Sequence, residues 1–477
     1  MGYRPLVKEI NYCAPETLLD KLGEKSGLIF LDSATHGQLT DLHSNYSYLM
    51  YEPFDSYVCT MDKANILTSL KEKINSYKLD KVDDLPPMQT GVAGYFSYDI
   101  CNNLDNVSLQ DNGKDYPRIA INFYNVVIAF DHRQKKAWII ANGYSEADAG
   151  YSEVIAEKRL KQVENDLQLN FPVKSNHTYS NECKIVVKAN YSQEEYCQMV
   201  EKAIEYIRAG DIFEVNLSQQ FRAELPNDIT ALELYKKLRN INPAPFAAYL
   251  NFDGFSIASA SPERFIKLTD NCVETRPIKG TRARGSNPLE DNRLADELVN
   301  SEKDRAENIM IVDLMRNDIS RVCEDNSVIV TQLCGLESFK SVHHLVSVVQ
   351  GKLKVGQHAL DLLEATLPGG SITGAPKIRA MQIIAELERN DRGPYCGSIG
   401  FISFNGEMDT SIVIRTMVIK NQVVTYQAGG AIVLDSVPLE EYKETLAKSH
   451  ALTKTLYSFF SDNTIKREAC NEECISH

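Results

Sequence analysis

The chain has 477 residues, of which 43% are hydrophobic and 24% are charged, and these shares are typical of a folded globular protein. Its 65 Asp and Glu residues outnumber its 51 Lys and Arg residues, and the resulting net charge of −14 argues against a protein that binds nucleic acids or anionic membranes. No apolar run approaches the roughly 18 residues of a membrane helix and the N-terminus has no apolar signal core, so we expect a cytoplasmic protein.

Hydrophobic periodicity divides the N-terminal part into short helices and strands. It predicts helices over 13–24 and 62–78, and strands over 28–32, 46–51 and 90–98. Residues 118–131 and 137–141 are typical of a β-hairpin whose turn is the charged segment 132–136. A long charged helix is predicted next, over about 146–167.

A loss of periodicity predicts a division of the chain. Residues 168–190 carry Pro172 and several turn formers, so we expect a linker there. This linker separates an N-terminal region, residues 1–167, from a catalytic region, residues 191–460. A polar tail, residues 461–477, ends the chain.

The second region begins with a helix over 192–208 and a strand-rich block over 211–279. Further helices and strands follow in turn. They are predicted over 289–300, 302–316, 358–366, 375–389 and 437–460 for helices, and over parts of 326–352, 395–404, 408–420 and 422–428 for strands. Adjacent strands joined by short turns predict an α+β fold in which helices pack outside antiparallel sheets.

Common catalytic signatures are missing from the sequence. There is no GxGxxG after a strand and no HExxH, so a Rossmann site and that type of zinc site have no support. The segment 369–377 resembles a P-loop but lacks the Lys-Ser or Lys-Thr pair after its second glycine. Its turn at Thr373 and Gly374 leads into a helix whose free N–H groups could attract an anion. Simple helix capping is the alternative.

Two pairs of carboxylates have helical spacing. Asp304 and Glu307 share one face of a predicted helix, and Glu441 and Glu444 share a face of the last helix. Four such carboxylates could converge on one Mg²⁺, a hard cation that takes oxygen ligands. The alternative is two solvated helix faces, which are common in a chain this acidic.

Lys279 lies between Pro and Gly in the segment 275–285, on a constrained loop that a ligand can approach. A lysine is a nucleophile only as the neutral amine, so the site would have to lower its pKa by burial or by cationic neighbours, and Arg282 and Arg284 could supply the latter. An exposed basic turn is the alternative interpretation.

Two other residue types point to acid–base chemistry. Glu263 is a candidate general acid if its pKa is raised. His343 and His344 lie in an apolar strand, so one side chain should face inward and the other outward, and a hydrogen-bonded core histidine is the default for the inward one.

Taken together, several segments resemble one family, the chorismate-utilising enzymes, over about residues 25–455. The order and spacing of eight segments carry the resemblance. They are GYFSYD (94–99), NPAPF (242–246), SPERF (261–265), TRPIKGTRARG (275–285), SEKDRAENIMIVDLMRND (301–318), LPGGSITGAPKIRAMQII (367–384), YCGSIGF (395–401) and AGGAIVLDSVPLEEYKET (428–445). The resemblance implies two large antiparallel β-sheets packed as a sandwich with helices outside.

Within the family, Lys279 indicates the branch that aminates chorismate at C4 to give 4-amino-4-deoxychorismate, for 4-aminobenzoate and folate biosynthesis. Anthranilate synthase large subunits are similar but carry Ala at this position. Isochorismate and salicylate synthases place a water-activating lysine at the position of Glu214, which argues against them. The aminating enzymes are expected to have Gln there, so Glu214 is a departure. It could polarise a water, which would permit some hydrolysis, or hold an ammonium ion.

The resemblance also implies a mechanism. Mg²⁺ held by Glu307 and Glu444, with Asp304 and Glu441 nearby, would anchor the ring carboxylate. Lys279 would attack C2 while Glu263 protonates the departing 4-hydroxyl, and ammonia would then enter at C4 and displace the lysine from C2. Further site residues follow by similarity. His344, beside the ring, is expected to be a third catalytic residue. The expected substrate-binding residues are Thr373 and Gly374 along the ring pocket, and Tyr395, Arg415, Gly429 and Gly430 around the enolpyruvyl carboxylate.

Two partners are implied. A separate glutamine amidotransferase subunit would supply ammonia, because the sequence contains no glutaminase elbow. Relatives bind tryptophan at a place that matches five residues here, namely Ser33, Asn45, Tyr46, Pro245 and Phe246, although Asn45 stands where Arg is expected. The alternatives to the C4-aminating enzyme are an anthranilate synthase component I and a non-catalytic subunit that senses tryptophan or chorismate.

Overall fold

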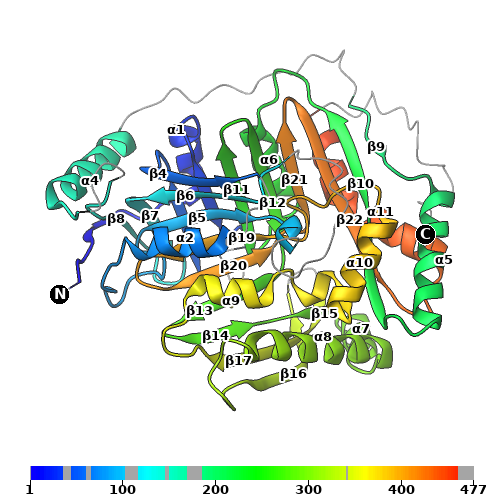
Figure 1. Ribbon diagram of the computed structural model, residues 1–477. Coiled ribbons are helices and arrows are strands. Elements are labelled where there is room, and N and C mark those ends of the chain that lie inside the picture. Colours follow the sequence, from blue (N-terminus) through cyan, green and yellow to red (C-terminus); the bar gives the residue numbers. More distant parts are fainter. Residues whose placement is uncertain are drawn as a thin grey trace.

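The computed structural model describes residues 2–35, 45–60, 66–101, 116–145, 150–168, 185–339 and 342–459. Its strands form two large antiparallel sheets, and its helices lie around them (Figure 1). The predicted α+β fold is therefore confirmed. None of the helices in these ranges is long and apolar enough to cross a membrane.

The first sheet has twelve strands. In spatial order they are β1 (Leu6–Ile10), β8 (Lys136–Ala141), β7 (Val126–Asp131), β3 (Tyr46–Met50), β2 (Ile29–Asp32), β11 (Phe246–Phe252), β12 (Phe255–Ser261), β21 (Thr416–Lys420), β22 (Val423–Ile432), β10 (Glu214–Glu224) and β18 (Gly374–Ala375), with β9 (Lys188–Ala189) beside β10.

The second sheet has ten strands. They are β15 (Ile278–Ala283), β17 (Val342–Lys352), β14 (Cys272–Thr275), β13 (Arg264–Thr269), β20 (Met408–Ile412), β19 (Ser398–Ser403), β5 (Gly91–Phe96), β6 (Ile119–Tyr124) and β4 (Asp55–Cys59), with β16 (Ile329–Ser338) beside β17.

The helices of the described residues are short to medium in length. They are α1 (Leu19–Leu22), α2 (Ile66–Asn75), α4 (Glu153–Gln168), α5 (Gln193–Arg208), α6 (Ala231–Ile241), α7 (Pro288–Val299), α8 (Glu302–Ser320), α9 (Ala359–Thr366), α10 (Lys377–Leu387) and α11 (Pro438–Tyr457).

Alternation along the strands shows how the layers pack. In β7, Val127 and Ala129 belong to a core that also contains residues of the ten-stranded sheet, whereas Val126 and Ile128 belong to a core shared with α1, α4, α6 and α11. The outer face of the ten-stranded sheet is covered by α2, α8 and α9. Successive side chains of a strand point to opposite faces, so the molecule is a sandwich of two sheets between two helical layers.

Two predicted strands are wrong in the same way. Residues 118–131 were expected to form one strand, but they form β6 and β7, which belong to different sheets and are separated by Asn125. The buried Asn125 side chain donates a hydrogen bond to the Tyr144 carbonyl at 3.0 Å and accepts one from Arg159. Residues 408–420 likewise divide into β20 and β21, and Arg415 at the crossing has φ 53°. Continuous apolar character does not reveal where a chain changes sheets.

Other predicted boundaries need smaller corrections. The block 211–279 was expected to be rich in strands, but it also contains α6, whose N-terminus has a capping box formed by Thr230 and Glu233. The helix predicted over 13–24 shortens to the 3₁₀ turn η1 (Pro15–Leu18) followed by α1. The β7–β8 hairpin agrees with its prediction.

Both sheets contain strands from each of the two predicted regions. β2 pairs with β11 in one sheet, and β5 pairs with β19 in the other. The division at 168–190 therefore stays a prediction, and 169–184 lie outside the described residues, as do 62–65, 146–149 and the tail 461–477.

Candidate active site

A cavity of about 1040 Å³ collects residues from both sheets and from α8 and α11. Most of the residues that the sequence singled out for catalysis and binding line it. They are Glu263, Lys279, Asp304, Glu307, His344, Tyr395, Arg415, Gly429, Glu441 and Glu444. The fold thus brings together side chains from segments that are far apart in the chain.

A β-bulge positions Lys279. The pairing of β15 with β17 shifts by one residue between Ile278 and Thr281, so Lys279 and Gly280 occupy the bulge. Bulges redirect side chains next to functional sites. Gly280 has φ 83°, and a Cβ there would lie 3.0 Å from the side chain of Asp304, so glycine allows β15 to approach α8 closely.

Lys279 is buried and paired with a carboxylate. Its Nζ donates a hydrogen bond to Glu214 Oε1 at 3.0 Å. Burial alone would lower the pKa of Lys279, but the negative charges of Glu214 and Glu307 outweigh it, and the pKa lies above its usual value. The expected lowering of the lysine pKa is therefore wrong for this structure, in which Lys279 rests as an ammonium.

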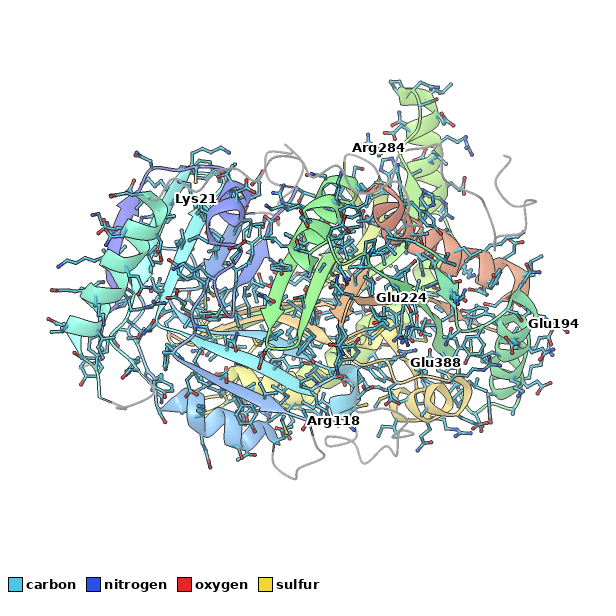
Figure 2. All side chains as sticks on the ribbon, turned by 90° about the horizontal axis from the view of Figure 1, so that it is seen from above. Lys21, Arg118, Glu194, Glu224, Arg284 and Glu388 are labelled. Carbon is cyan, nitrogen blue, oxygen red and sulfur yellow. The ribbon has the colours of Figure 1, made fainter. Side chains whose placement is uncertain are left out.

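The two arginines that were expected to lower this pKa have other partners. Arg282 contacts Glu297 at 3.1 Å and Asp304 at 3.2 Å. Arg284 forms an ion pair with Asp291 at 2.6 Å and lies toward the outside of the molecule (Figure 2). Their charges are satisfied by carboxylates, so they do not offset the acidic surroundings of the lysine.

Glu263 is a buried acid on the wall of the same cavity. Burial raises the pKa of Glu263 to about 7, although the hydroxyl of Ser371 and the charge of Lys279 act in the opposite direction. Ser371 Oγ donates to Glu263 Oε1 at 3.0 Å. A carboxyl group with this pKa is largely protonated at slightly acidic pH and half protonated near pH 7, as a general acid requires.

The two histidines of β17 face opposite sides, as the strand alternation predicts. His344 lines the cavity, and its Nδ1 lies 2.9 Å from Thr281 Oγ1. Burial lowers the pKa of His344, so its ring is neutral at pH 7. His343 is buried away from the cavity wall between Ser338 and Asp291, at 2.8 and 3.0 Å.

The four predicted metal carboxylates line one part of the cavity, but they are not equivalent. Glu444 contacts Lys448 Nζ at 2.6 Å, and Asp304 contacts Arg282. Burial raises the pKa of both Glu307 and Glu441. Glu441 Oε2 is buried and has no hydrogen-bond partner among the described residues.

Gly430 explains how two of these carboxylates approach each other. A Cβ at this position would lie 3.1 Å from Glu441 Oε2 and 3.2 Å from Glu444 Oε1. Carboxylate oxygens are the donors that Mg²⁺ takes, and an unpartnered buried oxygen fits such a ligand. In the part of the chain that the structure describes, no three His, Cys, Asp or Glu side chains are grouped closely enough to hold a metal ion. The carboxylate oxygens suit Mg²⁺ by their chemistry, but their arrangement in this structure is not that of a formed metal site. The ion therefore stays a proposal.

The predicted substrate-binding residues divide into two groups. Tyr395, Arg415 and Gly429 line the cavity. Gly430 is not among the lining residues, and neither are Thr373 and Gly374. Thr373 is fully buried, and its hydroxyl donates to the Gly369 carbonyl at 3.0 Å. The prediction that these two residues line the ring pocket is not confirmed, because their neighbours Ser371 and Ile372 line it instead.

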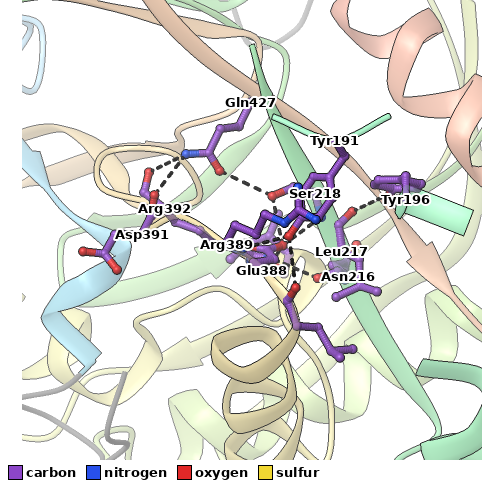
Figure 3. A network of polar contacts seen from close by, with 12 residues as sticks. Tyr191, Tyr196, Asn216, Leu217, Ser218, Glu388, Arg389, Asp391, Arg392 and Gln427 are labelled. Atoms are coloured by element: carbon purple, nitrogen blue, oxygen red, sulfur yellow. Dashed lines mark hydrogen bonds and ion pairs between the residues drawn. The ribbon is translucent and has the colours of Figure 1, made fainter. Parts of the chain in front are cut away.

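A buried ion pair behind the wall was missed from the sequence. Arg392 contacts Glu388 through Nε at 2.9 Å and through Nη2 at 2.7 Å (Figure 3). Its guanidinium also donates to the carbonyls of Asn216 and Ile372, at 2.7 and 3.0 Å. Asn216 and Ile372 both line the cavity. The i,i+4 spacing of Glu388 and Arg392 is visible in the sequence, but their burial is not.

Removing one partner of this pair is expected to destabilise the fold. Arg392→Met leaves the Glu388 carboxylate buried without its charged partner, so the free energy of unfolding should fall by about 3–5 kcal/mol. Arg389→Met is the matched control, because Arg389 is half exposed and its ion pair with Glu195 is on the surface, where solvent screening leaves a much smaller loss. Urea unfolding followed by circular dichroism measures both, and equal losses would contradict the expectation.

The five residues of the predicted tryptophan site lie together. Ser33, Asn45, Tyr46, Pro245 and Phe246 line a second, smaller cavity of about 90 Å³. Ser33 Oγ donates to the Tyr46 carbonyl at 2.6 Å, which holds β3 against the segment after β2. The binding of tryptophan there stays a prediction.

The sequence analysis did not single out several other cavity residues, of which three serve as examples. Ser371 donates to the proposed acid, Lys448 contacts Glu444, and Asn216 lines the wall. The i,i+4 spacing of Glu444 and Lys448 was the one visible signal. The other two depend on contacts between distant segments.

Comparisons with known proteins point to one family. The family described as "chorismate binding enzyme" matches residues 28–454. Aminodeoxychorismate synthase component 1 of Escherichia coli (strain K12) is 38% identical over 87% of this chain and 92% of the relative. Anthranilate synthase component 1 of Acetivibrio thermocellus is 36% identical over 93% of this chain and 92% of the relative. The solved anthranilate synthase component I of Streptococcus pneumoniae TIGR4 has a TM-score of 0.76, with 34% identity over 87% of this chain and 93% of that chain.

Proposed function

Because the chain belongs to the family of chorismate binding enzymes, we propose that it is an aminodeoxychorismate synthase component 1, which replaces the C4 hydroxyl of chorismate by an amino group. The observation that carries this proposal is the position of Lys279, which lies in the large cavity beside a protonatable Glu263. Such a pair supplies a nucleophile for C2 and an acid for the leaving hydroxyl.

In the proposed reaction Lys279 attacks C2 of the ring while Glu263 donates its proton to the 4-hydroxyl, which leaves as water. Ammonia then attacks C4 and displaces the lysine. The covalent adduct divides one difficult substitution into two easier steps. Arg415, Tyr395 and the backbone at Gly429 would hold the enolpyruvyl carboxylate, because an arginine is well shaped for a bidentate grip on a carboxylate.

Glu307 and Glu444 would hold Mg²⁺, with Asp304 and Glu441 nearby. The ion would supply a positive charge that anchors the ring carboxylate of the substrate. His344 is neutral and would pack beside the ring. These roles are supported by the common cavity that the residues line.

Ammonia would come from a separate glutamine amidotransferase subunit. The second cavity would take tryptophan as a structural or regulatory ligand between β2, β3 and β11. Both partners are proposals that rest on the resemblance to the family.

The second candidate is an anthranilate synthase component 1. Relatives with this name match the chain at about the same identity as those named aminodeoxychorismate synthase component 1. Lys279 opposes this candidate, since the resemblance expects Ala at this position in anthranilate synthases. A non-catalytic sensing subunit is opposed by the complete set of Glu263, Lys279, Glu307 and Glu444 in one cavity.

A product assay tests the proposal. The purified chain is incubated with chorismate, Mg²⁺ and ammonium at about pH 8.5, where part of the ammonium is free ammonia, and products are separated by chromatography with mass detection. We expect aminodeoxychorismate, which an added lyase converts to 4-aminobenzoate. Fluorescent anthranilate would favour the second candidate, and no turnover would favour an obligate partner or the sensing subunit.

Magnesium dependence should weaken when a proposed ligand loses its charge. Glu307→Gln and Glu444→Gln should each raise the Mg²⁺ concentration at half-maximal rate by about 10-fold or more, because each removes one anionic oxygen ligand. Asp313→Asn on the exposed face of α8 is the matched control. Magnesium titrations of the ammonium-dependent rate measure the effect, and unchanged titrations would contradict the assignment.

A further inference from the structure

Glu214, the hydrogen-bond partner of Lys279, is placed where it could also exchange a proton with the lysine. Glu214 begins β10, and its side chain is fully shielded from solvent. Its Oε1 accepts a hydrogen bond from Lys279 Nζ at 3.0 Å. Within the described ranges, no other carboxylate is hydrogen-bonded to this amine, and Glu307 and Glu263 act on it through charge alone. Glu214 is therefore the carboxylate in direct reach of the lysine proton.

The position of Glu214 is fixed by the backbone around it. Glu214 pairs with Ala375 of β18. A Cβ at Gly374 would lie 2.2 Å from the Glu214 carbonyl oxygen, so glycine is required for the two strands to meet. The Lys279 side chain is only 11% exposed. The pair therefore cannot separate by turning into solvent.

We propose that Glu214 is a further catalytic residue, which takes a proton from Lys279 before the amine attacks and returns it after the amine has left. The inference rests on the proposed function, because it assumes that Lys279 is the nucleophile. An ammonium has no free electron pair, so a proton must leave Nζ before a C–N bond can form. A carboxylate oxygen at 3.0 Å is within the reach that proton transfer requires.

The burial of Glu214 also bears on this transfer. Its Oε2 is buried and has no hydrogen-bond partner among the residues that the structure describes. A buried carboxylate with an unsatisfied oxygen is costly in its charged form. Taking the proton turns Glu214 into a neutral acid, which removes this cost until the proton returns to Lys279.

The proton and electron count closes over one turnover. Glu214 receives one proton from the Lys279 ammonium, and the neutral amine forms the C2–N bond as the ring double bonds shift and the C4–O bond breaks. Glu263 gives its proton to the departing hydroxyl, which leaves as water, and the adduct is a secondary ammonium. Ammonia then forms the C4–N bond, and the C2–N bond breaks.

The return steps restore the resting state. Lys279 leaves as a neutral amine and takes its proton back from Glu214. The new C4 ammonium gives one proton to Glu263. The net reaction converts chorismate and ammonia into aminodeoxychorismate and water. A glutamine at position 214, which the family resemblance leads us to expect, could hold Lys279 but could not take its proton. The inference therefore concerns this chain.

Adduct formation in the absence of ammonia isolates the proposed step. The chain is mixed with chorismate and Mg²⁺, and the mass of the peptide that contains Lys279 is followed in time. In Glu214→Gln, a variant of nearly the same shape, we expect adduct formation at pH 6 to slow by about 10²- to 10⁴-fold. The deficit should shrink as pH rises, because solvent then removes the lysine proton without help.

Two controls separate the possible outcomes. Glu224→Gln, at the exposed end of the same strand, should form the adduct at the rate of the unaltered chain. In Glu214→Ala, formate should enter the vacated space and restore part of the rate, whereas chloride should not. A rate in Glu214→Gln equal to that of the unaltered chain at pH 6, or the same rescue by chloride as by formate, would overturn the inference alone. Absence of the adduct in the unaltered chain would refute the proposed function and the inference with it.

Discussion

Replacing Lys279 by Ala is expected to reduce amination of chorismate by on the order of 10⁴-fold and to abolish the covalent adduct. The reason is that the two other lysines of the cavity, Lys303 and Lys448, are more exposed than the buried Lys279. Lys448 also lines the cavity, but its Nζ is held by Glu444 at 2.6 Å and by the Gly429 carbonyl at 2.9 Å. The measurement combines the ammonium-dependent rate with a tryptic map of the chain after exposure to chorismate.

The control for this prediction is Lys352→Ala, at the exposed end of β17, where the side chain is 63% exposed. This variant should keep both the rate and the adduct. An adduct at a different lysine in Lys279→Ala, or turnover close to that of the unaltered chain, would show that Lys279 is not the nucleophile. Anthranilate formed by Lys279→Ala would instead show that this lysine controls the position of amination.

The strand boundaries show what hydrophobic patterns can and cannot predict. Strands buried on both faces read as continuous apolar runs, so β7 and β8 were visible as a hairpin. The same property concealed the passage from β6 to β7 and from β20 to β21, since a run is equally apolar on both sides of a crossing. Asn125 and Arg415 mark the two crossings, but other polar residues, such as Asn122 and Ser411, lie within the strands of the same segments, so a polar residue alone does not identify a crossing.

The candidate site was predicted from the resemblance to a family more than from the hydrophobic and charge patterns of single segments. Taken one at a time, the motifs were also compatible with Lys279 in an exposed turn and with Glu307 on a solvated helix face. These residues line a common cavity because of the order of strands in the sheets, and the hydrophobic periodicity of a single segment does not reveal that order. Alignment with a family supplies this information indirectly, because order and spacing of distant motifs reflect a shared fold.

The resting charge of Lys279, the proposed nucleophile, differs most from what its sequence neighbours suggested. Arg282 and Arg284 are near Lys279 in sequence, and they were expected to lower its pKa. In the structure both are bound to carboxylates, and Glu214, from a strand 65 residues earlier, provides the decisive charge. Electrostatic effects depend on distance in space, so the sign of a pKa shift cannot be predicted from sequence neighbours alone.

Replacing Glu263 by Gln is expected to slow adduct formation by about 10²- to 10⁴-fold, because the departing hydroxyl then receives no proton from the enzyme. The pH dependence should change as well. The pKa of Glu263 is raised to about 7, and the protonated form is the active one. In the unaltered chain the rate should therefore be level below pH 7 and fall by about tenfold per pH unit above it.

Adduct formation without ammonia is the right measurement, because the overall rate also depends on the fraction of ammonia that is unprotonated. The residual rate in Glu263→Gln should not fall above pH 7, since the titrating group is gone. Asp270→Asn, at a side chain that is 72% exposed, should keep the profile of the unaltered chain. If Glu263→Gln keeps the fall above pH 7, another group donates the proton. A second variant, Ser371→Ala, tests the same assignment. It removes the hydrogen bond from Ser371 that stabilises the charged carboxylate of Glu263, so the pKa of Glu263 should rise. If Glu263 is the acid, the fall in rate should therefore begin at a higher pH in this variant.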